Sequence, residues 1–228
     1  MDLTIKPIAY IKTDFCQKFG IPRQSGRVKS LRAKVIFLPE YRNKEALREI
    51  ESFSHLWLIF DFSESHREEW SPTVRPPRLG GNKRVGVFAS RSPFRPNPLG
   101  LSCVELIKVD YSKEYGYYLE VGGADLLDDT PILDIKPYIR YSDSKPDAVS
   151  GYADKEERYS LNVVYDEKLL DIVPIEKREA LISCLKEDPR PSYQDDDRIY
   201  SMNFAGIEVR FTVKDDNLTI VETEEKMY

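Results

Sequence analysis

The sequence has few cysteines, no long apolar run, and no basic segment followed by an apolar block at its start. Its three cysteines, Cys16, Cys103 and Cys184, are odd in number and far apart, which argues against a disulfide framework or a cysteine metal site. We expect all three to be small buried apolar residues. The densest apolar stretch, residues 56–60, has only the length of a strand, far below the roughly 18 residues of a membrane span. These absences predict a cytoplasmic protein with no membrane segment and no bound metal.

The common cofactor motifs are missing as well. The sequence contains no G-x-G-x-x-G after a strand and no G-x-x-x-x-G-K-[ST], so neither a dinucleotide-type Rossmann turn nor a phosphate loop is predicted. The two histidines, His55 and His66, do not have the H-E-x-x-H spacing of a zinc site. We expect His55 to be structural because it adjoins an apolar strand, and His66 to be exposed because it lies in a charged loop.

What is present is the composition of a globular protein with a substantial core. The 228 residues are 41% hydrophobic and 32% charged, which fits one large domain or a large domain with a small one. The net charge of −5 does not favour nucleic acid, yet residues 6–34 hold eight Lys or Arg and one acid, and residues 75–95 hold six and no acid. Composition alone favours ordinary solvated charges, with a basic binding face as the alternative.

Hydrophobic patterns predict a mainly β first part. Residues 43–53 carry a helical apolar stripe with Asn43 as a candidate N-cap. The proline-rich stretch 63–82 predicts a loop. Short strands with one helix favour a β-barrel-like domain. The predicted strands cover residues 3–12, 32–38, 56–62, 84–89, 101–110 and 117–121.

A polar segment divides the chain in two. Residues 143–157 contain a proline and a glycine and predict a linker. The linker leaves a barrel-like domain over residues 1–142 and a small C-terminal α+β domain over residues 158–228. The predicted elements of the small domain are a helix over 175–185, followed by a hairpin of strands 207–213 and 218–221.

Two loop regions are candidates for a binding site. One is residues 22–26, and the other covers residues 72–82 and continues over 85–102. Prolines stiffen a loop, glycines allow close backbone approach, and arginines in a stiff loop offer fixed donors to a carboxylate or phosphate. The residues themselves leave two interpretations equally open. The loops bind a polar ligand, or they form a rigid lid on the barrel whose arginines are merely solvated.

Several short motifs occur together in this sequence: PRQ at 22–24, TVRPPRLGGN at 73–82, RSPFRPNP at 91–98, DLLDDTP at 125–131, DIKPY at 134–138, DPRP at 188–191 and RIY at 198–200. With them the chain resembles, over nearly its whole length, the TrmO (YaeB) family of S-adenosylmethionine-dependent tRNA methyltransferases. The resemblance implies a single β-barrel methyltransferase domain that is not a Rossmann domain, a small C-terminal domain, and a homodimer. It also implies S-adenosylmethionine as cofactor and the anticodon stem-loop of threonine tRNA as partner, with N6-threonylcarbamoyladenosine at position 37 as substrate.

The resemblance further implies a set of site residues. Asp197 and Tyr200 would be candidate general bases. Two features depart from the family pattern: the loop 63–66, and Asp129, which stands where we expect glycine. The tRNA-binding residues would be Arg75, Arg78, Lys83, Arg95 and Arg198. The cofactor-binding residues would be Pro22, Arg23, Gln24, Ser63, Glu64, Arg91, Leu101, Asp125, Leu126, Leu127 and Asp128.

The implied chemistry is direct in-line methyl transfer to N6 without a covalent enzyme intermediate. Positioning would contribute most, and a general base would help remove the N6 proton. Three alternatives stay open: a methyltransferase acting on another RNA or small molecule, a non-catalytic RNA-binding barrel, and a scaffold protein that reuses the barrel dimer. The last two need no cofactor, so cofactor binding separates them from the enzymes.

Overall fold

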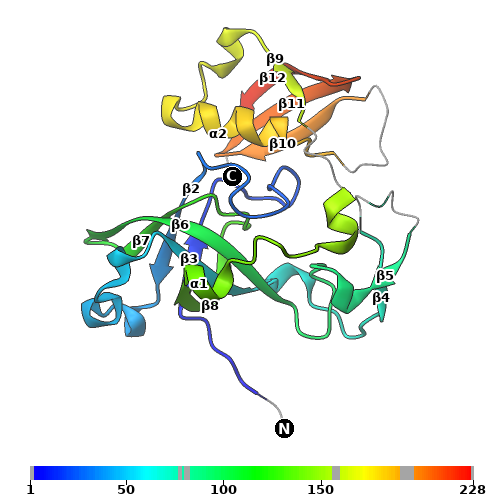
Figure 1. The fold of residues 1–228 in the computed structure, drawn as a ribbon. Coiled ribbons are helices and arrows are strands. Elements are labelled where there is room, and N and C mark those ends of the chain that lie inside the picture. Colours follow the sequence, from blue (N-terminus) through cyan, green and yellow to red (C-terminus); the bar gives the residue numbers. More distant parts are fainter. Residues whose placement is uncertain (1–2, 77–78, 80–82, 156–159, 191–197, 227–228) are drawn as a thin grey trace.

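The first part of the chain forms a ring of antiparallel strands (Figure 1). The computed structural model describes residues 3–76, 79, 83–155, 160–190 and 198–226. Within these residues, six strands pair in the order β1-β2-β7-β6-β3-β8, and β8 pairs back on β1, so the sheet closes into a barrel. The predicted barrel-like domain is confirmed. Its strands are β1 (Ala9–Lys12), β2 (Arg32–Phe37), β3 (His55–Asp61), β6 (Leu99–Ser112), β7 (Gly116–Gly122) and β8 (Thr130–Pro137).

Alternating side chains along these strands build the barrel core. In β3, Leu56, Leu58 and Phe60 are buried, and the side chains between them are only partly buried. This is the period of two that a strand with one core-facing side requires. The buried run places Phe60 next to the last residue of β3, where the barrel borders the cavity described below.

The helix predicted over residues 43–53 is wrong and is replaced by two 3-10 turns, η2 (Lys44–Leu47) and η3 (Ile50–Ser52). The predicted cap is present, because the Asn43 side chain accepts a hydrogen bond from the Glu45 backbone N–H. The helix stops because Glu49 has a left-handed φ of 65° between the two turns. Both turns still pack apolar side chains against the barrel core, so tertiary packing overrides local helix propensity here.

The predicted strand over 84–89 is also mostly wrong. Only β5 (Val85–Gly86) is a strand, paired with the equally short β4 (Thr73–Val74), and the chain continues as a 3-10 turn, η6 (Val87–Ala89). The β4–β5 hairpin lies at the edge of the molecule beside the barrel (Figure 1). The proline-rich stretch 63–76 is mainly loop, as expected, with one 3-10 turn, η4 (Ser63–Ser65).

The C-terminal part is a second sheet covered by a helix. β9 (Asn162–Val164) pairs in parallel with β12 (Asn217–Glu225), and β12 and β10 (Tyr200–Phe204) flank β11 (Ile207–Lys214). The predicted hairpin is confirmed as β11 and β12, and the predicted helix is α2 (Ile175–Lys186). A short helix, α1 (Arg140–Asp143), and a 3-10 turn, η7 (Gly151–Lys155), lie between the two sheets in sequence, and a second 3-10 turn, η8 (Glu167–Leu170), follows β9. The exact domain limits stay a prediction.

Residues 13–31 connect the two sheets in space although they precede β2 in sequence. Phe15, Val28 and Leu31 are buried in the hydrophobic core of the C-terminal sheet rather than in the barrel core. The carbonyl of Asp14 accepts a hydrogen bond of 2.8 Å from the backbone N–H of Ala205, at the β10–β11 turn. Figure 1 shows these blue loops directly below β10 and α2. This segment is therefore the part of the N-terminal region that the C-terminal sheet holds in place.

The cysteine prediction is confirmed only at Cys184, which is buried in the C-terminal core. Cys103 is partly buried and Cys16 is exposed, with its Sγ 3.1 Å from the side-chain oxygen of Asn203. The prediction failed at Cys16 because the residue lies on a loop between two sheets. No helix in the described residues has the length and apolarity to cross a membrane. The same residues contain no cluster of His, Cys, Asp and Glu arranged to hold a metal ion.

Candidate functional site

A cavity of about 470 Å³ opens where the barrel meets the loop of residues 18–24. Its volume lies in the range of about 300–1,000 Å³ that is common for small-molecule sites. The barrel contributes the end of β3, the start of β6 and the turn after β7. All of the predicted cofactor-binding residues except Asp128 line it, namely Pro22, Arg23, Gln24, Ser63, Glu64, Arg91, Leu101, Asp125, Leu126 and Leu127. The structure thus brings together residues from five separate stretches of the sequence.

An aromatic floor closes the barrel side of the cavity. The Phe60 ring lies directly over Gly100 of the neighbouring strand, where an added Cβ would come within 2.1 Å of the ring. Phe60 also meets Phe62 edge to face, with ring centroids 4.9 Å apart. Glycine at position 100 therefore leaves room for the Phe60 ring, and the two rings form an apolar surface at the bottom of the site.

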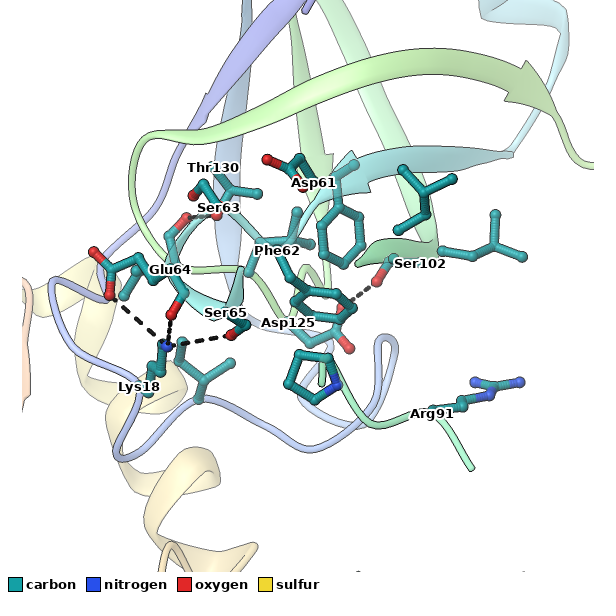
Figure 2. Close-up of a pocket in the computed structure, with 18 of the residues that line it drawn as sticks. Lys18, Asp61, Phe62, Ser63, Glu64, Ser65, Arg91, Ser102, Asp125 and Thr130 are labelled. Atoms are coloured by element: carbon teal, nitrogen blue, oxygen red, sulfur yellow. Dashed lines mark hydrogen bonds and ion pairs between the residues drawn. The ribbon is translucent and has the colours of Figure 1, made fainter. Parts of the chain in front are cut away.

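Asp125 is a partly buried carboxyl group on this wall. The hydroxyl of Ser102 donates a hydrogen bond of 2.5 Å to its Oδ1 (Figure 2). Burial raises the pKa of Asp125 above its usual range, although the Ser102 hydrogen bond and the charge of Arg91 act in the opposite direction. A cationic ligand beside this carboxyl group would stabilise its ionised form, so the group is suited to binding a positive charge.

Lys18 fixes the opposite wall. Its ammonium group donates to the carbonyl of Glu64 at 3.0 Å and to the Ser65 hydroxyl at 3.4 Å, as the dashed lines in Figure 2 show. The Glu64 carboxylate lies 3.9 Å from the same ammonium. The 3-10 turn η4 is therefore tied to the loop of residues 18–24 by one side chain.

The arginines of the cavity are also held in place. Arg91 donates a hydrogen bond to the side-chain oxygen of Gln24. Arg23 donates one of 2.6 Å to the backbone carbonyl of Arg190, which belongs to the C-terminal part of the chain. Arg190 in turn is buried and forms a two-pronged ion pair with Asp188. The C-terminal DPR motif thus contacts the cavity wall through Arg23.

Asp128 serves a local structural role instead. Its Oδ1 accepts a hydrogen bond of 2.8 Å from the Thr13 backbone N–H, and its other oxygen lies 3.4 Å from Lys12. Asp129, the residue that stands where we expected glycine, has a left-handed φ of 59°. Aspartate is one of the few residues besides glycine that adopts this conformation at modest cost. Lys12 contacts its carboxylate at 2.6 Å.

Of the two candidate bases, Tyr200 is not among the described residues that line the cavity. Tyr200 is buried in the C-terminal core, where its ring stacks on Phe19 and Phe211. The guanidinium of Arg198 lies over the same ring, 4.8 Å from its centroid. Asp197 lies outside the described residues, as does Arg78. A base role for Asp197 or Tyr200 stays a prediction.

Of the remaining residues predicted to bind tRNA, one lines the cavity and two are exposed beside β4 and β5. Arg95 is partly buried and lines the cavity itself, while Arg75 and Lys83 are exposed on the β4–β5 hairpin.

The two histidines lie outside the cavity lining. His66 is exposed, as expected, and its Nε2 lies 2.8 and 2.9 Å from the two carboxylate oxygens of Asp61, a lining residue. His55 begins β3, and its Nδ1 lies 2.9 Å from the Ser54 hydroxyl oxygen.

Sequence reasoning missed several lining residues. A signal was available for Ser102, because it is a polar residue on the inward-facing side of a predicted strand. Leu99 and Gly100 lie in the candidate binding stretch 85–102, although nothing singled them out within it. No local signal pointed to the residues outside that stretch, since their role depends on which segments meet in space. The missed residues include Lys18, Phe60, Asp61, Phe62, Ser65, Leu99, Gly100, Ser102 and Thr130.

Comparison with known protein families covers nearly the whole chain. Residues 10–144 match the tRNA-methyltransferase O N-terminal domain, and residues 161–226 match the TrmO C-terminal domain. A tRNA (adenine(37)-N6)-methyltransferase of Escherichia coli K12 is 38% identical over 226 residues, which cover 95% of this chain and 96% of that protein. A protein of the same name from Eikenella corrodens is 47% identical over 165 residues, 72% of this chain and 92% of that protein.

Two further comparisons bear on cofactor and fold. A Pseudomonas aeruginosa protein, RcsF, whose name describes an S-adenosylmethionine-dependent methyltransferase, is 39% identical over 204 residues, 85% of this chain and 84% of that one. A crystal structure of TrmO from Pseudomonas aeruginosa superposes with a TM-score of 0.79 and 30% identity, and covers 98% of this chain and 100% of that chain.

Proposed function

The chain belongs to the tRNA-methyltransferase O family, and from that premise we propose that it transfers a methyl group from S-adenosylmethionine to N6 of adenine 37 in a tRNA. The observation that carries the proposal is the cavity beside the barrel. Its lining joins PRQ, RSPFRPNP and DLLDDTP, three motifs that are far apart in sequence. Stiff loops that converge on one cavity from separate places are better explained by a shared ligand than by independent solvent caps.

The side chains that line the cavity suit each part of this cofactor. The Phe60–Phe62 floor offers apolar aromatic surface to an adenine ring. The guanidinium groups of Arg23 and Arg91 can pair with the cofactor carboxylate. The Asp125 carboxyl can face its positive charges. When bound, the cofactor supplies a methyl group carried on a positively charged sulfur.

The contribution of the protein is mainly to hold the reacting groups. The aromatic floor and the Lys18 contact to η4 hold the cavity walls in position. The walls therefore need little rearrangement when a ligand binds. The apolar floor also keeps water from one side of the reacting groups. The N6 proton must leave as the new bond forms, and Asp197 and Tyr200 are the proposed acceptors. Because Tyr200 does not line the cavity of its own chain, we propose that the C-terminal part of a second subunit supplies this group.

The finer parts of the proposal concern substrate and assembly. We propose N6-threonylcarbamoyladenosine in threonine tRNA as the substrate, because its carboxylate gives Arg95 a partner beside the cavity. We also propose a homodimer in the cytoplasm. Sedimentation of the purified protein gives the assembly state, and methylation assays on tRNA with and without the threonylcarbamoyl group give the substrate.

The decisive experiment is a calorimetric titration of the purified protein with S-adenosylmethionine, paired with mass spectrometry of tRNA nucleosides from cells with and without the protein. We expect one binding event per chain and loss of one methylated adenosine species in the cells without it. A folded protein with no heat of binding would contradict the enzyme and favour the RNA-binding or scaffold alternatives. Cofactor binding with unchanged tRNA nucleosides would move the activity to another substrate.

A further inference from the structure

Two large aromatic rings lie exposed beside the β4–β5 hairpin. The side chains of Trp70 and Phe88 are 55% and 76% exposed, and their rings stack with centroids 6.4 Å apart and planes 30° apart. Rings of this size are mostly buried in folded proteins, so an exposed stacked pair requires an explanation. We call these two residues the aromatic pair.

The backbone holds Phe88 firmly. The preceding residue, Val87, is buried, and its N–H donates a hydrogen bond of 2.9 Å to the carbonyl of Pro72. The Ser90 hydroxyl donates to the Val87 carbonyl at 2.8 Å, and Arg95 donates to the Ser90 carbonyl at 3.2 Å. The exposed ring is therefore presented by an anchored turn, which lowers the entropy lost when a ligand stacks on it.

The aromatic pair adjoins the candidate cofactor site. Phe88 lines a second cavity of about 330 Å³, and this cavity shares Arg95 and Leu99 with the first one. A ligand that lies against Phe88 can therefore reach the first cavity past these two side chains.

The charge of the segment that carries Phe88 indicates the kind of ligand, although Trp70 itself directly follows the exposed acids Glu68 and Glu69. Residues 75–95 contain six basic side chains and no acid. Lys83, Arg84 and Arg91 are exposed within this stretch. A twofold contact through this surface would bring the basic residues of two copies together, whereas nucleic-acid phosphates carry the opposite charge. Exposed aromatics among basic residues are the usual means of binding unpaired bases.

We propose that the aromatic pair is a stacking platform for unpaired bases of the anticodon loop, next to the entrance through which the target adenine reaches the first cavity. The proposal rests on the proposed function, because it takes tRNA as the substrate. Unpaired loop bases expose both faces, so a fixed aromatic ring can stack on them whatever their sequence. The basic residues nearby would contact the phosphates between those bases.

The test measures RNA binding and cofactor binding separately in one set of variants. Phe88→Leu keeps an apolar side chain but removes the ring, and Phe88→Tyr keeps the ring. For an anticodon stem-loop RNA followed by fluorescence anisotropy, we expect Phe88→Leu to raise Kd about 5- to 100-fold, with a similar fall in kcat/KM. We expect Phe88→Tyr to stay within about threefold of the unmodified protein, and Trp70→Leu to resemble Phe88→Leu.

The chain supplies a control in a second aromatic pair, in which Tyr111 is exposed and Tyr117 is partly buried. Tyr111 is 60% exposed and meets Tyr117 with centroids 5.1 Å apart, on the β6–β7 hairpin. We expect Tyr111→Leu to leave RNA affinity unchanged, and all of these variants to bind S-adenosylmethionine with unchanged affinity.

Three results would overturn the platform: unchanged RNA affinity in both Phe88→Leu and Trp70→Leu, an equal loss in Tyr111→Leu, or a loss that follows a change from dimer to monomer in sedimentation. The last result would identify the pair as a contact between copies of the chain. Failure of the proposed function is distinguishable, because it would appear as absent cofactor binding in the unmodified protein. RNA anisotropy would still decide the platform in that case.

Discussion

The two walls of the cofactor cavity are held in different ways. The barrel wall, with Phe60 and Ser102, lies on β3 and β6, and each of these strands is hydrogen-bonded to a neighbour on both sides. The loop wall, residues 18–24, contains no strand or helix. Within it, Phe19 and Ile21 are partly buried against the hydrophobic core of the C-terminal sheet, and Phe15 and Val28 on either side of it are buried in that core.

The C-terminal sheet therefore has a role in the cavity, although none of its strands lines the cavity. It packs on the segment that carries the PRQ motif, and through the carbonyl of Arg190 it fixes Arg23. The barrel core can form the floor by itself, whereas the loop wall depends on the second core. Damage to the two cores should therefore have unequal effects on ligand binding.

The largest expected effect is that of Phe15→Ala. Phe15 is 1% exposed and meets Phe204 edge to face at 5.5 Å, so its truncation leaves a cavity between the loop and the C-terminal sheet. We expect the free energy of unfolding to fall by about 3–5 kcal/mol. Urea unfolding measures the loss, and calorimetry on the folded variant should show weaker S-adenosylmethionine binding.

The comparison is made with Phe37→Ala in the barrel core, at a residue that does not line the cavity. This variant should lose a similar amount of stability but retain more of the cofactor affinity in its folded fraction. Equal affinities in the two variants would show that the loop wall does not depend on the C-terminal core.

A smaller effect is expected for Gly20→Ala, where the loop touches β10. Gly20 has a φ of 97°, and an added Cβ would lie 2.2 Å from the sulfur of Met202, which is fully buried. We expect a loss of about 1–3 kcal/mol in the free energy of unfolding, from backbone strain and overpacking together. Thermal or urea unfolding measures it.

Gly26→Ala separates the two causes. Gly26 lies in the same segment and also has a positive φ, 74°, but an added Cβ there would meet nothing within 4 Å. It should show only the strain. If both variants lose the same stability, the close approach of Gly20 to the C-terminal sheet has no energetic weight.

Much of the barrel could be predicted from the sequence, and the junction could not. Strands β2, β3, β6 and β7 and helix α2 follow from local periodicity, which neighbouring residues determine. β8 was not predicted, and it carries prolines at positions 131 and 137, which weaken the strand pattern. No local pattern shows that Phe15 packs with Phe204, because 188 intervening residues separate them.

The site divides in the same manner. Arg23, Arg91 and Asp125 were identified because they belong to recognisable motifs. The Phe60–Gly100 contact and the Lys18 contact to η4 depend on strand register and loop docking. Register and docking are settled only when the whole chain packs, so the motifs gave the polar groups of the cavity and the structure was needed for its floor and its loop wall.

The barrel wall yields a prediction of opposite sign, for Asp125→Asn. Because burial raises the pKa of Asp125, the folded protein holds this proton more tightly than the unfolded chain, whose Asp pKa is about 3.9. The free energy of unfolding contributed by this group therefore falls as pH rises from that value through the raised pKa. We compare the free energy of unfolding of Asp125→Asn with that of the unmodified protein at each pH. The difference should favour the variant more near pH 7 than near pH 4.

Cofactor affinity should move the other way. The asparagine keeps an oxygen that can accept from Ser102 but has no charge for a cationic ligand, so S-adenosylmethionine should bind more weakly near pH 7. Urea unfolding at both pH values, with calorimetry near pH 7, measures both quantities. A variant that is both more stable and equally tight would show that the Asp125 carboxyl does not face the cofactor.

The smallest expected effect is that of the ion pair between Arg27 and Glu187, which joins the segment 13–31, just beyond the loop wall, to the end of α2. Their side chains are 29% and 21% exposed, so solvent screens part of the attraction. A double-mutant cycle with Arg27→Gln and Glu187→Gln should give a coupling of about 0.2–1 kcal/mol in the free energy of unfolding. The coupling should shrink between about 0.05 and about 0.5 M salt.

The pair of Arg48 and Glu45 serves as the control. Their side chains are 70% and 66% exposed and lie within one turn of the barrel domain, so their coupling should be smaller still. A coupling as weak at Arg27 as at Arg48 would mean that the C-terminal sheet holds the loop wall through buried apolar contacts alone, and that charge plays no part in joining the two cores.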